Sequence, residues 1–179
     1  MTAQDFLPKG YNVPSKKSSY LKLQEGETKV RITASPLVGW EDWKDNKPVR
    51  TEEEHKPLGF GDDGKVRYPK HFRAMPVYDY ADGEIKILTI TQKAIMGAIT
   101  EYMNTEEYGS PLGYDLKISK SGKGIDTKYT CVALPPKELS KEIKAKIDSV
   151  KVNLPALWDN EDPMAITDPM DSVDSDTPF

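Results

Sequence analysis

The chain has 179 residues, of which 30% are charged and 37% hydrophobic, with a mean hydropathy of −0.64 and a formal net charge of −4. No apolar run approaches the ~20 residues that span a bilayer, and the first residues lack the apolar core of a signal peptide. The single cysteine, Cys131, excludes an internal disulfide and leaves a zinc site short of thiolates. We therefore expect a cytoplasmic protein with one domain, no metal and no other cofactor.

The first 34 residues predict an arm followed by a strand. Residues 1–19 contain Pro, Gly, Ser and Lys without apolar periodicity, which is typical of a flexible arm. Residues 28–34 then alternate strictly, with Val30 and Ile32 on one face and Arg31 on the other. This pattern predicts a half-buried strand whose outer face is basic.

More strands are expected between residues 37 and 90. A second strand is predicted over about 37–43, and residues 44–67 form a charged, Gly-rich segment that is typical of a long functional or mobile loop. Strands over about 70–80 and 84–90 meet at Asp82-Gly83, and this dipeptide between apolar runs favours a hairpin.

The second half of the chain predicts a helix, a hairpin and another helix. Thr91 can cap a helix through residue 103, strands are expected around 114–119 and 126–134, and residues 139–150 suit a charged helix. Five or six strands with one inserted helix favour a mainly β fold, an OB-like Greek-key barrel over residues 20–158. A β-sandwich is the alternative.

The segment from residue 159 to residue 179 carries seven acidic side chains and no basic one. Such a segment buries too little apolar surface to fold alone, so we expect a disordered acidic tail that interacts with proteins. The remaining residues, 1–158, carry 25 basic and 22 acidic side chains, a net charge of +3. A basic body with an acidic arm is expected of a protein that binds polyanions.

Aromatic side chains recur among Lys and Arg in the predicted strands. Binding of single strands needs both groups, because cations neutralise phosphates while aromatic rings stack on unpaired bases. For any single aromatic residue, packing in the core is the competing interpretation. The predicted DNA-binding residues are Arg31, Trp40, Trp43, Lys70, Arg73, Tyr78, Tyr80, Lys120, Lys123, Lys128 and Tyr129.

Catalytic motifs are not evident. Residues 59–65 have the spacing GxxxxGK, but Val66 stands where a phosphate-binding loop needs Ser or Thr, and Asp62 and Asp63 would repel phosphate. With two histidines and no Cys-His pairing, no general acid-base pair can be named. We expect a binding protein, not an enzyme.

Four segments together resemble bacteriophage single-stranded DNA-binding proteins. They are Tyr20–Ile32 with its Leu-Lys-Leu and Lys-Val-Arg-Ile runs, Gly39-Trp40-x-x-Trp43, Phe72–Tyr78, and Tyr114–Tyr129 with Gly122 and Gly124. The resemblance covers about residues 20–135 plus the tail. It implies an OB-fold that coats single-stranded DNA during phage replication and recombination, within the host cytoplasm.

The resemblance also implies roles for the tail. Its tip would dock replication proteins of the polymerase, helicase or primase class, as the Pro-Phe tip of bacterial single-stranded DNA-binding proteins does. The residues implied are Asp171, Asp174, Asp176, Pro178 and Phe179. Self-association on DNA is a further expectation. T-even phage members of the family hold zinc in a Cys- and His-bearing loop, whereas residues 44–67 contain no cysteine, so a metal-free variant is expected.

Two other function classes stay open at this point. A protein-only adaptor, with an OB-like or β-sandwich body and an acidic docking tail, is compatible with the small net charge of the body. A nuclease or recombinase subunit would need clustered carboxylates for magnesium, and none can be assigned. Annealing of strands would use the same surface as coating them.

Overall fold

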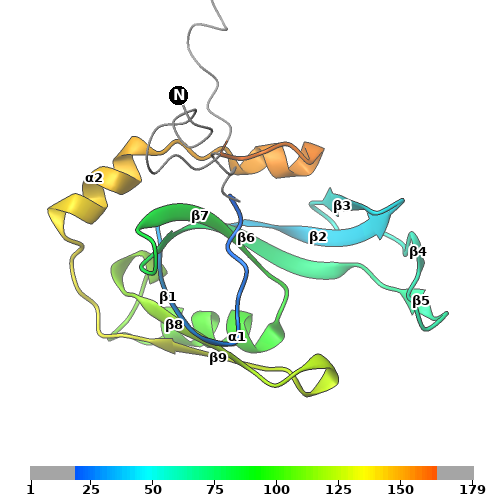
Figure 1. Ribbon diagram of the computed structural model, residues 1–179, viewed down its shortest axis with the longest axis horizontal. Coiled ribbons are helices and arrows are strands. Elements are labelled where there is room, and N and C mark those ends of the chain that lie inside the picture. The colour runs from blue at the N-terminus through cyan, green and yellow to red at the C-terminus, as the bar shows by residue number, and fades with distance from the viewer. Residues whose placement is uncertain (1–18, 165–179) are drawn as a thin grey trace, which may run out of the picture.

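The computed structural model describes residues 19–164 and is mainly β, as predicted (Figure 1). Seven antiparallel strands form one sheet: β1 (Gly26–Ile32), β2 (Leu37–Lys44), β3 (Lys47–Thr51), β6 (Lys70–Asp79), β7 (Glu84–Ile90), β8 (Leu116–Ser121) and β9 (Lys128–Ala133). A separate hairpin pairs β4 (Gly59–Phe60) with β5 (Val66–Arg67). The helices are α1 (Lys93–Met103) and α2 (Lys141–Ser149), with short 3-10 turns η2 (Pro111–Gly113), η3 (Gly124–Asp126) and η4 (Leu154–Asp159). Within residues 19–164, each helix is too short or too polar to cross a membrane.

Strand β1 connects the two halves of the sheet. The order is β3-β2-β6-β1-β8-β9, and β7 pairs with the other edge of β6. The N-terminal part of β1 pairs with β8 and its C-terminal end pairs with β6, so the sheet curves around α1 (Figure 1). Among the described residues no ladder joins β7 to β9, so the sheet is not closed into a barrel.

The strand count exceeds the predicted five or six because residues 44–67, predicted as a loop, contain three short strands. Asp45 and Asn46 both have positive φ values, 51° and 61°, and form the tight turn between β2 and β3. Asn and Asp tolerate this conformation better than other non-glycine residues. The prediction of a structureless loop was therefore wrong for this segment.

Apolar side chains form two clusters on opposite sides of β6. The first lies between the concave side of the sheet and α1, and includes Val30, Met75, Val77 and Leu116. The second contains Phe72, Ala74, Ile87 and Leu157, where η4 covers the other side of β6 and β7. Because β6 is covered on both sides, it is the most buried strand of the sheet.

The described start of the predicted tail belongs to the body. The Asn160 side chain donates to the Pro48 carbonyl at 2.8 Å, and Pro163 is buried. Before them, Trp158 packs on Gly39, where an added Cβ would lie 2.7 Å from the indole and 2.5 Å from the Thr51 carbonyl oxygen. Residues 159–164 are therefore not a solvated arm, and the predicted boundary at 159 was too early.

Arg31 lies in the interior, which contradicts the predicted exposed basic face of its strand. Its side chain is 2% exposed, because the β9–α2 connection and η2 cover it. Nε donates to the Asp115 carboxylate at 2.7 Å, while Nη1 and Nη2 donate to the Leu112 and Lys137 carbonyls, both at 3.1 Å. All three bonds are internal, so Arg31 is not available to phosphates.

Candidate nucleic-acid interface

A continuous line of aromatic, apolar and cationic side chains follows one face of β2. Gly39 faces the second cluster, so its neighbours in alternation, Val38 and Trp40, face the side of the sheet that carries α1. Val38 pairs with Arg73 of β6, and Trp40 pairs with His71. Together with Pro36 just before the strand, these residues are called the β2 stripe: Pro36, Val38, Trp40, His71 and Arg73.

The rings and the guanidinium of the stripe are held in place by neighbours. The Trp40 and His71 ring centroids lie 5.1 Å apart with planes tilted by 59°. Arg73 donates to the Met96 carbonyl at 3.4 Å and to Thr100 Oγ1 at 3.2 Å, which fixes the guanidinium against α1. His71 Nδ1 is buried without a hydrogen-bond partner among the described residues. Half-buried rings beside a fixed cation can accept a stacked base and a phosphate.

Strand β2 belongs to a projecting arm, defined as residues 37–68 with the β2–β3 and β4–β5 hairpins (right in Figure 1). Three aromatic side chains of the arm are well exposed: Trp43 at 45%, Phe60 at 68% and Tyr68 at 69%. Exposed aromatic rings that cluster on one projection are unusual for core packing and typical of a binding surface.

Buried Asp42 ties the two hairpins of the arm together. Its carboxylate accepts from the Trp43 amide at 2.7 Å, the Leu58 amide at 2.9 Å and Arg67 Nε at 2.8 Å. Arg67 also donates to the Trp43 carbonyl. Burial alone would raise the pKa of Asp42, but these hydrogen bonds and the Arg67 charge outweigh it and lower the pKa below its ordinary value. The ionised carboxylate therefore stabilises the shape of the arm.

A second basic element is the β8–η3–β9 hairpin, Leu116–Ala133, called the lysine hairpin. It carries four lysines, Lys117, Lys120, Lys123 and Lys128, against one carboxylate, Asp126. Lys120 Nζ lies 5.9 Å from the centre of the Tyr129 ring, on the side of the sheet that bears α1. The tip of the hairpin points toward the same end of the molecule as the arm (Figure 1).

Tyr78 and Tyr80 lie on the opposite face of the sheet from Trp40. Their rings meet edge to face at 5.0 Å, and Lys29 Nζ lies 4.3 Å over the Tyr80 ring. The Tyr80 hydroxyl donates to the buried Asp115 carboxylate at 2.8 Å. Burial and this carboxylate raise the pKa of Tyr80 above its ordinary value. Its hydroxyl is therefore committed to the fold.

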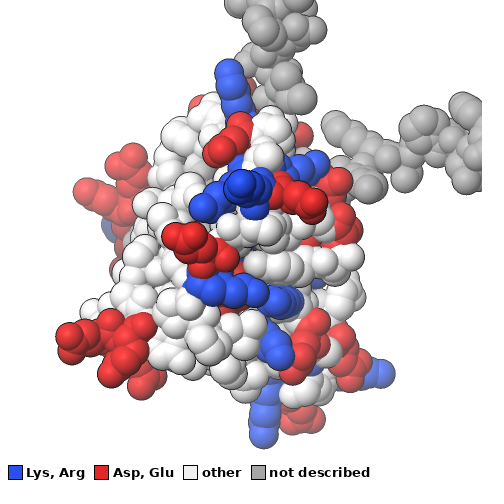
Figure 2. Space-filling model, turned by 90° about the vertical axis from the view of Figure 1, so that its left-hand side faces the viewer, with Lys and Arg blue, Asp and Glu red and all other residues white. Residues whose placement is uncertain are grey.

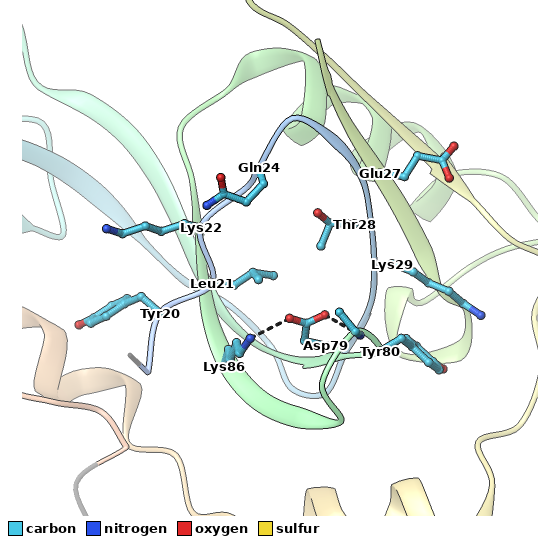
Figure 3. A pocket seen from close by; sticks show the side chains of 11 residues that line it. Tyr20, Leu21, Lys22, Gln24, Glu27, Thr28, Lys29, Asp79, Tyr80 and Lys86 are labelled. Carbon is cyan, nitrogen blue, oxygen red and sulfur yellow. Dashed lines mark hydrogen bonds and ion pairs between the residues drawn. The ribbon is translucent and has the colours of Figure 1, made fainter. Parts of the chain in front are cut away.

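Tyr80 also borders a cavity of about 690 Å³ between residues 20–24 and β1 (Figure 3). Leu21 and Thr28 point into it, and an ion pair between Asp79 and Lys86, 2.9 Å apart, forms its floor. Lys22 and Lys29 point away from its centre (Figure 3). A neutralised floor gives this cavity no preference for anions.

The structure therefore distributes the predicted DNA-binding residues over several surfaces. It brings Trp40 and Arg73 together on the β2 stripe, and pairs Lys120 with Tyr129, with Lys123 at the hairpin tip. Trp43 is exposed on the opposite face of β2, Lys70 is exposed at the start of β6, and Lys128 is exposed on the lysine hairpin, at the start of β9. The predicted tail residues, Asp171, Asp174, Asp176, Pro178 and Phe179, lie outside the described residues.

The end of the molecule opposite the arm has no continuous basic surface. Figure 2 shows Lys and Arg side chains running through the middle of that side, with Asp and Glu side chains among and beside them. Mixed charge of this kind attracts a polyanion less than a surface of one sign. The arm, residues 37–68, also has mixed charge, with six basic and eight acidic side chains, so the arm end is the better candidate because of its exposed aromatic rings and not because of its charge.

Four residues of this interface are absent from the predicted DNA-binding residues: Phe60, Arg67, Tyr68 and His71. Arg67 and Tyr68 belong to the pattern of aromatic and basic residues that predicted the site, but they were not selected from it. Phe60 had no such signal, because it lies on a short hairpin that the sequence did not predict. His71 lies on the predicted strand 70–80, and its place beside Trp40 follows from the register of β2 on β6.

No protein family, curated protein or solved structure matches this chain. Among residues 19–164, no group of three or more His, Cys, Asp and Glu side chains is placed to hold a metal ion.

Proposed function

We propose that this chain is a sequence-independent single-stranded DNA-binding protein whose bound strand runs along the β2 stripe and the arm. The observation that carries the proposal is the alignment of Trp40, Val38 and Arg73 on one face of the sheet, together with the exposed rings of Phe60 and Tyr68 on the arm. Rings stack on any base and cations neutralise any phosphate, so this surface would not select a sequence.

Strand pairing supports an OB-like assignment for the body. An OB-fold is a partly open, five-stranded Greek-key barrel that binds ligands on strands 2 and 3 and on the loops joining strands 1–2 and 4–5. The pairs β1–β6, β6–β7, β1–β8 and β8–β9, with α1 between β7 and β8, follow that order. The two loops then correspond to the arm and the tip of the lysine hairpin, which point the same way (Figure 1).

The acidic segment beyond the body would have two roles in this proposal. It would compete with DNA for the cations of residues 1–158, which carry a net charge of +3. It would also recruit replication and recombination proteins, in line with the resemblance to the phage family.

Titration of the full chain with oligo-dT tests the proposal. Trp fluorescence should be quenched, and affinity should fall with salt by about 0.7 in log-log slope per neutralised phosphate. Trp40→Ala should weaken binding, whereas Tyr78→Ala, an aromatic truncation on the opposite face, should not. If no salt-sensitive binding occurs, the proposal fails.

A protein-only adaptor is the second candidate, favoured by the apolar side chains that the arm exposes beside its aromatic rings, Leu58 at 42% and Val66 at 45%. Substituting both Trp40 and Trp43 separates the two functions. An adaptor would keep its partner after the double substitution, whereas a DNA-binding protein would lose its DNA.

A further inference from the structure

An apolar cavity of about 230 Å³ lies at the end of the β2 stripe, where residues 32–36 meet the end of α1 and η2. Its interior is formed by buried Ile32, Met75 and Ile99. Met103, 49% exposed, and Leu112, 45% exposed, also line it. Arg73 is the single charged residue of the lining, which contains no carboxylate.

The cavity is continuous with the stripe. Pro36 and Arg73 belong to both, and Val38, 45% exposed, lies between the cavity and Trp40 on the same face. Trp40 lies two positions along the strand from Val38, about 7 Å at ~3.4 Å per residue. A DNA strand that stacks a base on Trp40 and follows the β2 stripe therefore reaches the cavity.

We propose that this cavity takes up one base of the bound strand, an inference that rests on the proposed function. A base is a flat ring whose faces can contact the Met, Leu and Ile side chains, and whose edge carries oxygen and nitrogen acceptors for Arg73. An engineered apolar cavity of about 150 Å³ holds benzene, so 230 Å³ has room for a ring. The phosphates stay outside, because the interior offers no solvation for them.

Uptake of a base would also favour single strands over duplex DNA. A base must leave its stack to enter a pocket, and the cost is smallest for a base that is already unpaired. Duplex DNA would have to break a pair at this position. The cavity therefore adds discrimination that phosphate contacts alone do not supply.

The experiment is a scan of abasic sites in the shortest dT oligonucleotide that the full chain binds with full affinity. One abasic residue is placed at each position in turn, and the dissociation constant is measured by fluorescence anisotropy. For the wild-type chain, the affinity should fall fivefold or more when the abasic residue replaces the base that enters the cavity, in the range of about 1–3 kcal/mol for a lost base contact.

Filling the cavity provides the matched comparison. Ser35 is exposed and lines the cavity, so Ser35→Trp should block the cavity. Ala145→Trp adds the same ring at an exposed position of α2. For the Ser35→Trp variant, an abasic residue in place of the base that enters the cavity should no longer lower the affinity, whereas abasic residues at the other positions should lower it as they do for the wild-type chain. Ala145→Trp should behave as wild type. Leu112→Trp repeats the test from the other side of the cavity if Ser35→Trp lowers the melting temperature.

The outcomes separate the two claims. If the oligonucleotides bind but Ser35→Trp and Leu112→Trp retain the full abasic pattern, the cavity holds no base while the proposed function stands. A cavity that instead accepts an apolar peptide side chain gives that same result. If the wild-type chain binds none of the oligonucleotides, both the cavity proposal and the proposed function fall.

Discussion

Replacing Arg31 by Met tests whether this arginine belongs to the fold or to the DNA interface. The guanidinium makes three internal hydrogen bonds, and the side chains of Arg31 and its partner Asp115 are 2% and 0% exposed. Arg31→Met would leave the buried Asp115 carboxylate with the Tyr80 hydroxyl at 2.8 Å and with the ammonium groups of Lys29 and Lys137 at 3.8 and 3.9 Å. Removing one partner of a buried ion pair costs about 3–5 kcal/mol when the other partner is left unpaired, and the two lysines, which are 35% and 60% exposed, compensate the Asp115 charge only in part.

Against a typical stability of about 5–15 kcal/mol, that loss is large. At about 2–4 °C per kcal/mol for a chain of this size, the melting temperature should fall by roughly 6–20 °C. Urea unfolding followed by circular dichroism measures the free energy directly. The double variant Arg31→Met/Asp115→Leu replaces the whole pair with apolar groups and should recover most of the loss.

The same variant has a DNA-binding readout. Under conditions where Arg31→Met remains folded, its salt slope for oligo-dT should equal that of the wild-type chain. Unchanged stability together with a reduced salt slope would refute the reasoning, because Arg31 would then contact phosphate.

Four further predictions concern the interface, the arm and the tail. Trp40→Ala should weaken oligo-dT binding by about 1–3 kcal/mol in anisotropy titrations, the range found for base stacking. Arg73→Gln should reduce the log-log salt slope by about 0.7. The pKa of Asp42 is lower in the folded chain than in the unfolded chain, where it is about 3.9. The ionised carboxylate therefore stabilises the fold above the unfolded pKa, and this stabilisation is lost as the pH falls through the folded pKa. Asp42→Asn should remove that acid-dependent part of unfolding. Truncation after Met164 should leave the melting temperature unchanged and oligo-dT affinity equal or higher, whereas truncation after Trp158 should lower the melting temperature, because Asn160 and Pro163 pack on the body.

Each of these has an opposing result. An oligo-dT affinity that is unchanged by Trp40→Ala would show that the β2 stripe is not part of the interface. A log-log salt slope that is unchanged by Arg73→Gln would show that Arg73 does not contact phosphate. Identical acid unfolding with Asp42→Asn would show that Asp42 does not link the hairpins. A clear loss of DNA affinity on truncation after Met164 would contradict competition by the acidic segment.

Local patterns predicted the elements that depend on local chemistry. The hairpin at Asp82-Gly83 was predicted from its turn residues and is confirmed, with Gly83 at a φ of 71°. The charged helix predicted over 139–150 is confirmed as α2, with Ser140 accepting from the Ile143 amide at 3.3 Å. The predicted cap of α1 was wrong. Gln92, not Thr91, is the residue that precedes the helix, and its side chain makes no capping hydrogen bond.

The features that the sequence did not predict depend on contacts between segments that are distant in the chain. The alternating pattern predicted that Arg31 lies on the face of its strand opposite Val30 and Ile32. It did not predict that residues 112 and 137 cover that face. Trp40 and Arg73 were both predicted as site residues, yet their adjacency follows from the register of β2 on β6, which no local pattern reveals. The arm escaped prediction because β3, β4 and β5 are short and polar.

Hydrogen exchange of the full chain, with and without saturating oligo-dT, tests the central claim most directly. If DNA runs along the β2 stripe and the arm, exchange should be slower in β2, in the β4–β5 hairpin and at His71–Arg73 when DNA is bound, with no change around Tyr78–Tyr80. Protection confined to the Tyr78–Tyr80 face, or no protection at all, would contradict it.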